Sequence, residues 1–134
     1  MAMQVIHDGQ TIDEHVTGTA VSIGVYDGVH LGHRTLLQQL CGIAESEGLA
    51  TAVVTFDKHP ALVTRPENAP TLLSTLEQKL ELLEAEGIDY VYLVEFTEER
   101  AKTEAAQFVR EVFVDGVRAK SIVVGEDFHF GRNR

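Results

Sequence analysis

The chain has 134 residues, a formal net charge of −10 and a mean hydropathy near zero. This length is ordinary for one domain, and a hydrophobic content of 44% is typical of a globular protein rather than a disordered one. The negative charge argues against non-specific nucleic-acid binding, which needs clustered lysine and arginine side chains. We therefore expect no nucleic-acid partner.

The sequence carries no signal for export or for a membrane. No apolar run reaches the length of a membrane span, and the first residues lack the basic and apolar regions of a signal peptide. Cys41 is the single cysteine, so no intrachain disulfide can form, which fits a reducing compartment. Its position on the apolar side of an expected helix predicts a buried structural thiol. We expect a cytoplasmic protein with no membrane partner.

Strand and helix patterns alternate along the chain. A capping box starting at Ser74, with Glu77 three residues later, is expected to open the second helix. The charge run at 98–100 is expected on a solvated helix face. Alternating strands and helices predict an α/β fold, a Rossmann-like open parallel sheet with helices on both faces. Strands are expected over 4–7 (a short edge strand), 19–25, 50–56, 90–96 and 121–124, and helices over 34–46, 76–86 and 104–114.

Unusual residues gather where the expected strands end. Ligands bind beyond the carboxyl ends of the strands in an open parallel sheet. Four of the six histidines lie in segments that follow strands, and they would therefore share one edge of the sheet: His30, His33, His59 and His129.

Residues 24–33, Gly-Val-Tyr-Asp-Gly-Val-His-Leu-Gly-His, predict a phosphate site between the strand over 19–25 and the following helix. His30 and His33 are three residues apart near a helix start, so both imidazoles can face one side. Gly32 lets a ligand approach the backbone, and the exposed amides of the first turn attract anions. The alternative is two surface histidines on an ordinary loop. Zinc binding is disfavoured because no spacing supplies three or four ligands.

Two further loops have a functional and a structural interpretation each. Lys58 and His59, in Asp-Lys-His-Pro, could contact phosphate, or the loop beyond could cover a flat ligand; the alternative is a charged turn. In the glycine-bounded segment 125–131, aromatic residues could stack on a ring while Asp127 accepts hydrogen bonds. The alternative there is that Phe128 and Phe130 cap the core.

The stretch over 24–33 resembles the signature of the HxGH nucleotidyltransferases. Nearly the whole chain is similar to the N-terminal FMN adenylyltransferase module of bacterial bifunctional riboflavin kinase/FAD synthetases, through blocks at 22–30, 55–60, 72–74, 79–83, 108–109 and 123–131. The resemblance implies FMN + ATP → FAD + pyrophosphate with Mg²⁺, by direct attack of the FMN phosphate. It implies catalytic roles for His30 and His33; ATP binding by Gly24, Val25, Tyr26, Asp27, Gly28, His30, Gly32 and His33; and flavin binding by His59, Pro60, Asp127, Phe128 and Phe130. It does not identify metal ligands.

The chain also departs from this family. Tyr26 stands where phenylalanine is usual, and Asp57-Lys58 where Glu-Pro is usual. A later segment that would supply a phosphate-binding arginine is not among the 134 residues, nor is the riboflavin kinase domain that a parent chain would carry. We therefore expect residues 1–134 to be one nucleotidyltransferase domain, incomplete at its C-terminal side, with weak or no transferase activity and no kinase activity alone. The alternatives are another HxGH nucleotidyltransferase and a non-catalytic remnant that binds flavin or nucleotide.

Overall fold

The computed structural model describes residues 3–24, 26, 31–57, 75–95 and 97–124, with residues 31–33 described by their backbone. No helix within these ranges has both the length and the apolar character needed to cross a membrane. The elements in chain order are β1 (Gln4–His7), β2 (Thr19–Ile23), α1 (Leu31–Glu47), β3 (Ala50–Phe56), α3 (Leu76–Ala85), β4 (Tyr90–Val94), α4 (Glu98–Ala101), α5 (Ala105–Phe108), the π-helical segment η2 (Val109–Gly116) and β5 (Ala119–Val124).

The five strands form one parallel sheet in the order β1-β4-β3-β2-β5. Residue Ile23 at the end of β2 pairs with Val54 of β3 on one side and with Val124 of β5 on the other. Because every strand runs the same way, all carboxyl ends meet at one edge. The predicted parallel α/β sheet is confirmed, and so are the expected edge strand and the bounds of the strand over 50–56.

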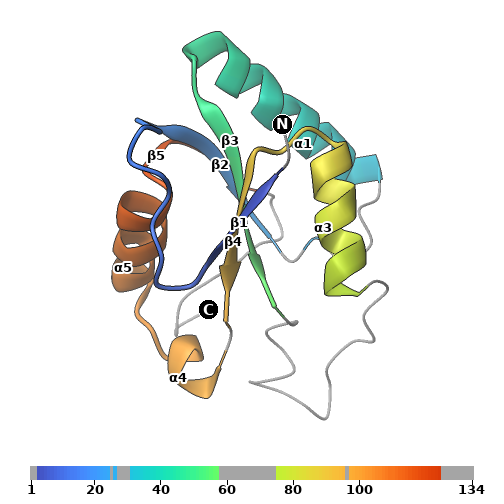
Figure 1. Cartoon of the computed structure of the whole chain (residues 1–134). Coiled ribbons are helices and arrows are strands. Elements are labelled where there is room, and N and C mark those ends of the chain that lie inside the picture. Colours follow the sequence, from blue (N-terminus) through green and yellow to red (C-terminus); the bar gives the residue numbers. More distant parts are fainter. Residues whose placement is uncertain (1–2, 25, 27–30, 58–74, 96, 125–134) are drawn as a thin grey trace.

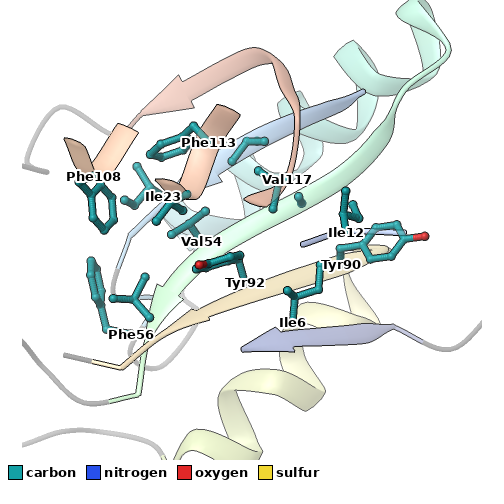
Figure 2. Packing of buried hydrophobic residues seen from close by; sticks show 14 of the residues in the cluster. Ile6, Ile12, Ile23, Val54, Phe56, Tyr90, Tyr92, Phe108, Phe113 and Val117 are labelled. Atoms are coloured by element: carbon teal, nitrogen blue, oxygen red, sulfur yellow. The ribbon is translucent and has the colours of Figure 1, made fainter. Parts of the chain in front are cut away.

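Helices cover both faces of the sheet (Figure 1), as predicted: α1 and α3 lie on one side, and α5 lies on the other. Under α5 and η2, the side chains of Val54, Tyr92, Phe108 and Phe113 belong to one buried cluster (Figure 2). Leu37 of α1 and Leu83 of α3 belong to a second cluster on the opposite face, with Val53 and Val91. Strands β3 and β4 are buried on both faces, which explains their continuous apolar sequences.

Local signals set most helix ends, with one shift. Gly48 follows α1 and Gly87 follows α3, and they have φ angles of 69° and 91°, which glycine adopts without strain. The capping box is present but lies one residue further on, at Thr75 and Gln78 instead of Ser74 and Glu77. Thr75 Oγ1 accepts from the Gln78 amide at 3.1 Å, and Gln78 Oε1 accepts from the Thr75 amide at 2.9 Å.

The region after β4 differs most from the expected single helix over 104–114. A short helix, α4, begins after Thr97, whose side chain accepts a hydrogen bond from the Arg100 amide. The main helix continues from α5 into η2 and extends to Gly116, where the Val117 amide donates to the Val112 carbonyl at 3.0 Å. A Cβ on Gly116 would lie 2.8 Å from Cε2 of Tyr92, so close packing against β4 requires glycine there.

Cys41 is a free, half-buried thiol on α1. Its Sγ donates to the Glu86 carbonyl oxygen at 3.7 Å. Burial, together with Asp89 and Glu86, raises the pKa of this thiol above its ordinary value. A thiol kept protonated is a poor nucleophile, which agrees with the expected structural role.

Candidate functional site

The strand order creates a switch point at the carboxyl ends of β2 and β5. From β2 the chain adds β3 and then β4 in one direction, and it afterwards returns to place β5 on the other side of β2. The crossovers on the two sides of β2 therefore lead to opposite faces of the sheet (Figure 1). In open α/β sheets a ligand crevice forms where the connections diverge in this way. The turn between β2 and α1, which carries the histidine motif, starts at this position.

Gly24 and Tyr26 show how the turn leaves β2. The Gly24 amide donates to the Val54 carbonyl at 3.0 Å, so the turn is still attached to β3 at this residue. Tyr26 has a φ of 55°, an uncommon conformation for a residue other than glycine. Its ring lies against Gly24, where a Cβ would meet Cε2 of the ring at 3.0 Å. Gly24 thus provides room for the tyrosine ring.

The Tyr26 side chain is buried, with 2% of the residue exposed. Its hydroxyl and the Oγ of Ser22 are 2.5 Å apart, and Ser22 is fully buried. Burial raises the pKa of the Tyr26 hydroxyl above its ordinary value, while the Ser22 hydrogen bond acts in the opposite direction. The Tyr26 ring belongs to the buried cluster that includes Leu37 and Leu40, and its assigned role in ATP binding stays a prediction.

Helix α1 starts directly after the turn and has 17 residues. Its first turn contains no acidic residue, so no carboxylate of that turn offsets the positive end of the helix dipole. Gly32 and His33 have backbone positions in this first turn. The His33 side chain lies outside the described part of the structure, as do Val25, Asp27, Gly28 and His30, so these assignments stay predictions.

The carboxyl end of β3 is held from two sides. The Asp57 amide donates to the Val94 carbonyl of β4 at 3.0 Å. On the other side, Nζ of Lys79 donates to Oγ1 of Thr55 at 3.3 Å and to the carbonyl oxygen of Phe56 at 3.1 Å. Strands β3 and β5 flank β2, and the residues assigned to flavin binding follow them in sequence: His59 and Pro60 after β3, and Asp127, Phe128 and Phe130 after β5. All five lie outside the described residues, so their assignments stay predictions.

Comparison with known proteins identifies the family. The profile of the FAD synthetase family matches residues 12–134. The chain belongs to the FAD synthetase family. Its relatives include proteins named bifunctional riboflavin kinase/FMN adenylyltransferase: that of Escherichia coli K12 is 38% identical over 117 residues, and that of Haemophilus influenzae is 34% identical over 132 residues. The relative from Buchnera aphidicola of Schizaphis graminum is 30% identical over 132 residues.

These relatives are longer than the chain. The matched region is 87–98% of this chain but only 37–43% of the relatives. A solved structure described as the macrolide-efflux protein from Streptococcus pneumoniae has a TM-score of 0.77 and 25% identity, over 96% of this chain and 43% of that one. Its likeness supports the α/β fold of the family.

A polar network at the carboxyl ends of β1 and β4 was not anticipated from the sequence. Arg100 was expected on a solvated face, but only 14% of its side chain is exposed, and its guanidinium contacts Asp8 at 2.9 Å and Glu111 at 2.5 Å. The Tyr92 hydroxyl donates to Asp8 Oδ1 at 3.0 Å and accepts from the Gly9 amide at 2.9 Å. Burial is the main cause that raises the pKa of Tyr92 to about 12.

This network borders a cavity of about 630 Å³ that is lined largely by polar side chains. They come from the segment that follows β1, from β4 and the residues after it, and from α4, α5 and η2. The only local signal for it was that Asp8 follows an expected strand. Long-range pairing of β1 with β4 brings Asp8 to Arg100, and sequence spacing does not show this. Within the described ranges, no group of three or more histidine, cysteine, aspartate or glutamate side chains could hold a metal ion.

Proposed function

We propose that the chain is an FMN adenylyltransferase domain that transfers AMP from ATP to FMN, giving FAD and pyrophosphate. The observation that carries the proposal is the position of the motif over 24–33, which follows β2 at the switch point of an FAD synthetase family member. The family membership and the names of the relatives support the choice of FMN as the acceptor.

The reaction needs charge stabilisation and positioning more than covalent chemistry by the protein. An oxygen of the FMN phosphate attacks the α-phosphorus of ATP and forms a new P–O bond. The bond between the α-phosphorus and the oxygen that bridges the α- and β-phosphates breaks. Pyrophosphate leaves with the bonding electron pair, so negative charge grows on the transferred and leaving groups. His30 and His33 would donate hydrogen bonds to these oxygens, and the N-terminus of α1, whose first turn has no acidic residue, would add positive potential.

The sheet order supports binding of the two substrates side by side. Strand β2 lies between β3 and β5, so the segments that start at residues 57 and 125 begin on either side of the histidine turn. His59 and Pro60 on one side, and Asp127, Phe128 and Phe130 on the other, are the proposed flavin residues. ATP is taken as its magnesium complex, and we assign no protein ligand to the metal ion.

The test incubates the chain with FMN and Mg-ATP and separates the flavins by chromatography. We expect the chain to form FAD at a low rate, and we expect His30→Ala and His33→Ala to lower this rate by about 100-fold or more, as loss of a preorganised donor does elsewhere. His15→Ala is the matched control, because His15 is an exposed histidine between β1 and β2. Its rate should equal that of the unmodified chain.

Other outcomes would favour the alternatives. Binding of FMN or ATP without turnover would indicate a non-catalytic binding domain. Turnover of a different phosphate acceptor, with no FAD from FMN, would indicate another HxGH nucleotidyltransferase. Equal rates for all three histidine variants would refute the catalytic assignment.

A further inference from the structure

The cavity beside β4 has strongly acidic walls. Its described lining residues include five carboxylates and one guanidinium: Asp8, Glu95, Glu99, Glu111, Asp115 and Arg100. Carboxylates around one cavity repel each other, and the repulsion is stronger where water is partly excluded. Within the described part of the cavity wall, Arg100 is therefore the residue that offsets this repulsion. The proposed transfer makes no use of it.

Arg100 joins three elements across the cavity. Its Nη2 donates to Oδ1 of Asp8, which follows β1, at 2.9 Å, and its Nη1 donates to Oε1 of Glu111, in η2, at 2.5 Å. Only 14% of the Arg100 side chain and 15% of the Asp8 side chain are exposed. The guanidinium carbon also lies 5.2 Å from the centre of the Phe108 ring. Arg100 thus connects α4 to the end of β1 and to the helix that covers this face of the sheet.

Apart from Arg100, the residues of α4 contribute little to the core. This helix has only four residues, none of them is buried, and it lies beyond the end of β4 (Figure 1). Its cap at Thr97 and its backbone hydrogen bonds lie within the segment over 97–103. Ala101 is partly buried and packs against the cluster under α5. An element with so few buried contacts can open locally at a small cost in free energy.

The burial of Arg100 is only partly compensated. Its Nε is buried and has no hydrogen-bond partner within the described part of the chain, which costs free energy. The closed arrangement therefore depends on the contacts with Asp8 and Glu111. Salt weakens contacts between charges that water reaches, and 42% of the Glu111 side chain is exposed.

We propose that α4 is a salt-sensitive movable wall of this cavity and that Arg100 is the latch that holds it closed. In the closed state, the guanidinium lies between Asp8 and Glu111. In the open state, α4 moves away from the end of β1, Arg100 enters solvent, and water and cations reach the carboxylates of the cavity. The inference does not rest on the proposed function, because no substrate takes part in the opening.

Amide hydrogen exchange of the peptide over 97–104 measures this opening without any substrate. The unmodified chain is compared in about 0.01 M and about 1 M NaCl, between which the Debye length falls from about 30 Å to about 3 Å. Rates are divided by those of the urea-unfolded chain at the same salt concentration. We expect exchange over 97–104 to be roughly tenfold faster at the higher concentration, the scale of losing one charge-assisted hydrogen bond. The peptide over 90–94, from the buried strand β4, should exchange equally in both solutions.

Variants test whether Arg100 is the latch. Arg100→Met keeps an apolar side chain against Phe108 but removes the guanidinium, so exchange over 97–104 should be fast already at low salt and should no longer respond to salt. Glu111→Gln removes one charged partner and should give a smaller increase. It also provides the test if Arg100→Met does not fold. The matched control is Arg110→Met, because Arg110 is an exposed arginine of the segment that carries Glu111, and it should behave as the unmodified chain does.

Three results would overturn the inference. Equal exchange of the unmodified chain over 97–104 at both salt concentrations would show that the wall is not salt-sensitive. Slow exchange over 97–104 in both Arg100→Met and Glu111→Gln would show that Arg100 does not hold α4. Equal acceleration over 90–94 and 97–104 would show that the whole chain unfolds, instead of α4 opening by itself.

Discussion

Tyr26→Phe removes the hydroxyl that pairs with Ser22 beneath the turn leading to the histidine motif. Both residues are buried, so the change leaves Ser22 Oγ without this partner in the core. Leaving a buried hydroxyl without its partner costs about 1–3 kcal/mol. Ser22→Ala should also destabilise the fold, because it removes the same hydrogen bond between two buried side chains.

The double variant should be less destabilised than the sum of the two single variants. Replacing both partners by apolar groups removes the hydrogen bond without leaving either group buried alone. We therefore expect a coupling free energy of about 1–2 kcal/mol. In a domain of this size, each kcal/mol shifts the Tm by roughly 4 °C.

Urea unfolding of the four proteins, followed by circular dichroism, gives the free energies of unfolding for this cycle. Tyr90→Phe is a control, because the Tyr90 hydroxyl has no hydrogen-bond partner assigned among the described residues. Its effect should stay below about 0.5 kcal/mol. Additive single effects, with a coupling below about 0.5 kcal/mol, would refute the argument that this pair stabilises the turn as a unit.

Three further predictions concern the face covered by α5 and η2. Gly116→Ala should lower the free energy of unfolding by about 1–3 kcal/mol, because the new Cβ would lie 2.8 Å from the Tyr92 ring. Gly42→Ala is the control: its Cβ would meet nothing within 4 Å, so it should stabilise the chain in the same thermal unfolding experiment. The pKa of Tyr92 rises from 10.0 to about 12 on folding, so its contribution to stability is complete below pH 10 and is lost as the pH rises to about 12. Tyr92→Phe should therefore make Tm decline less steeply between pH 10 and pH 12. An unchanged decline would contradict this assignment. Arg100→Met should lower the free energy of unfolding, measured in urea, by about 1–3 kcal/mol, because it leaves the Asp8 carboxylate without its guanidinium partner. An unchanged free energy of unfolding would show that solvent compensates for this contact.

Local sequence signals were sufficient for most elements. The strand over 50–56 was predicted with its observed bounds, because a run of apolar and β-branched residues lies between a helix-ending glycine and a charged residue. The helix cap at 74–75 was displaced by one residue. Ser74 and Thr75 are both good caps, and each is followed three residues later by Glu77 or Gln78. Local chemistry does not choose between these two positions.

Contacts between distant residues were not predictable in the same way. Arg100 belongs to a charge run that favours a solvated helix face, yet pairing of β1 with β4 brings Asp8 beside it, and only 14% of the Arg100 side chain is exposed. The segment over 24–33 was predicted to lie between a strand and a helix, but the burial of the Tyr26 ring with side chains of α1 was not predicted. Both results depend on which strands become neighbours.

The sequence by itself determined that the chain is a parallel α/β domain with a glycine- and histidine-rich segment before its first long helix, because periodicity and composition are local properties. Only the tertiary structure decided that β2 lies between β3 and β5, and that Lys79 fastens the end of β3 to α3. Strand order and buried polar contacts depend on pairing between residues far apart in the chain, which no local pattern encodes. The histidine turn and the two segments proposed for the flavin thus begin side by side as a consequence of folding.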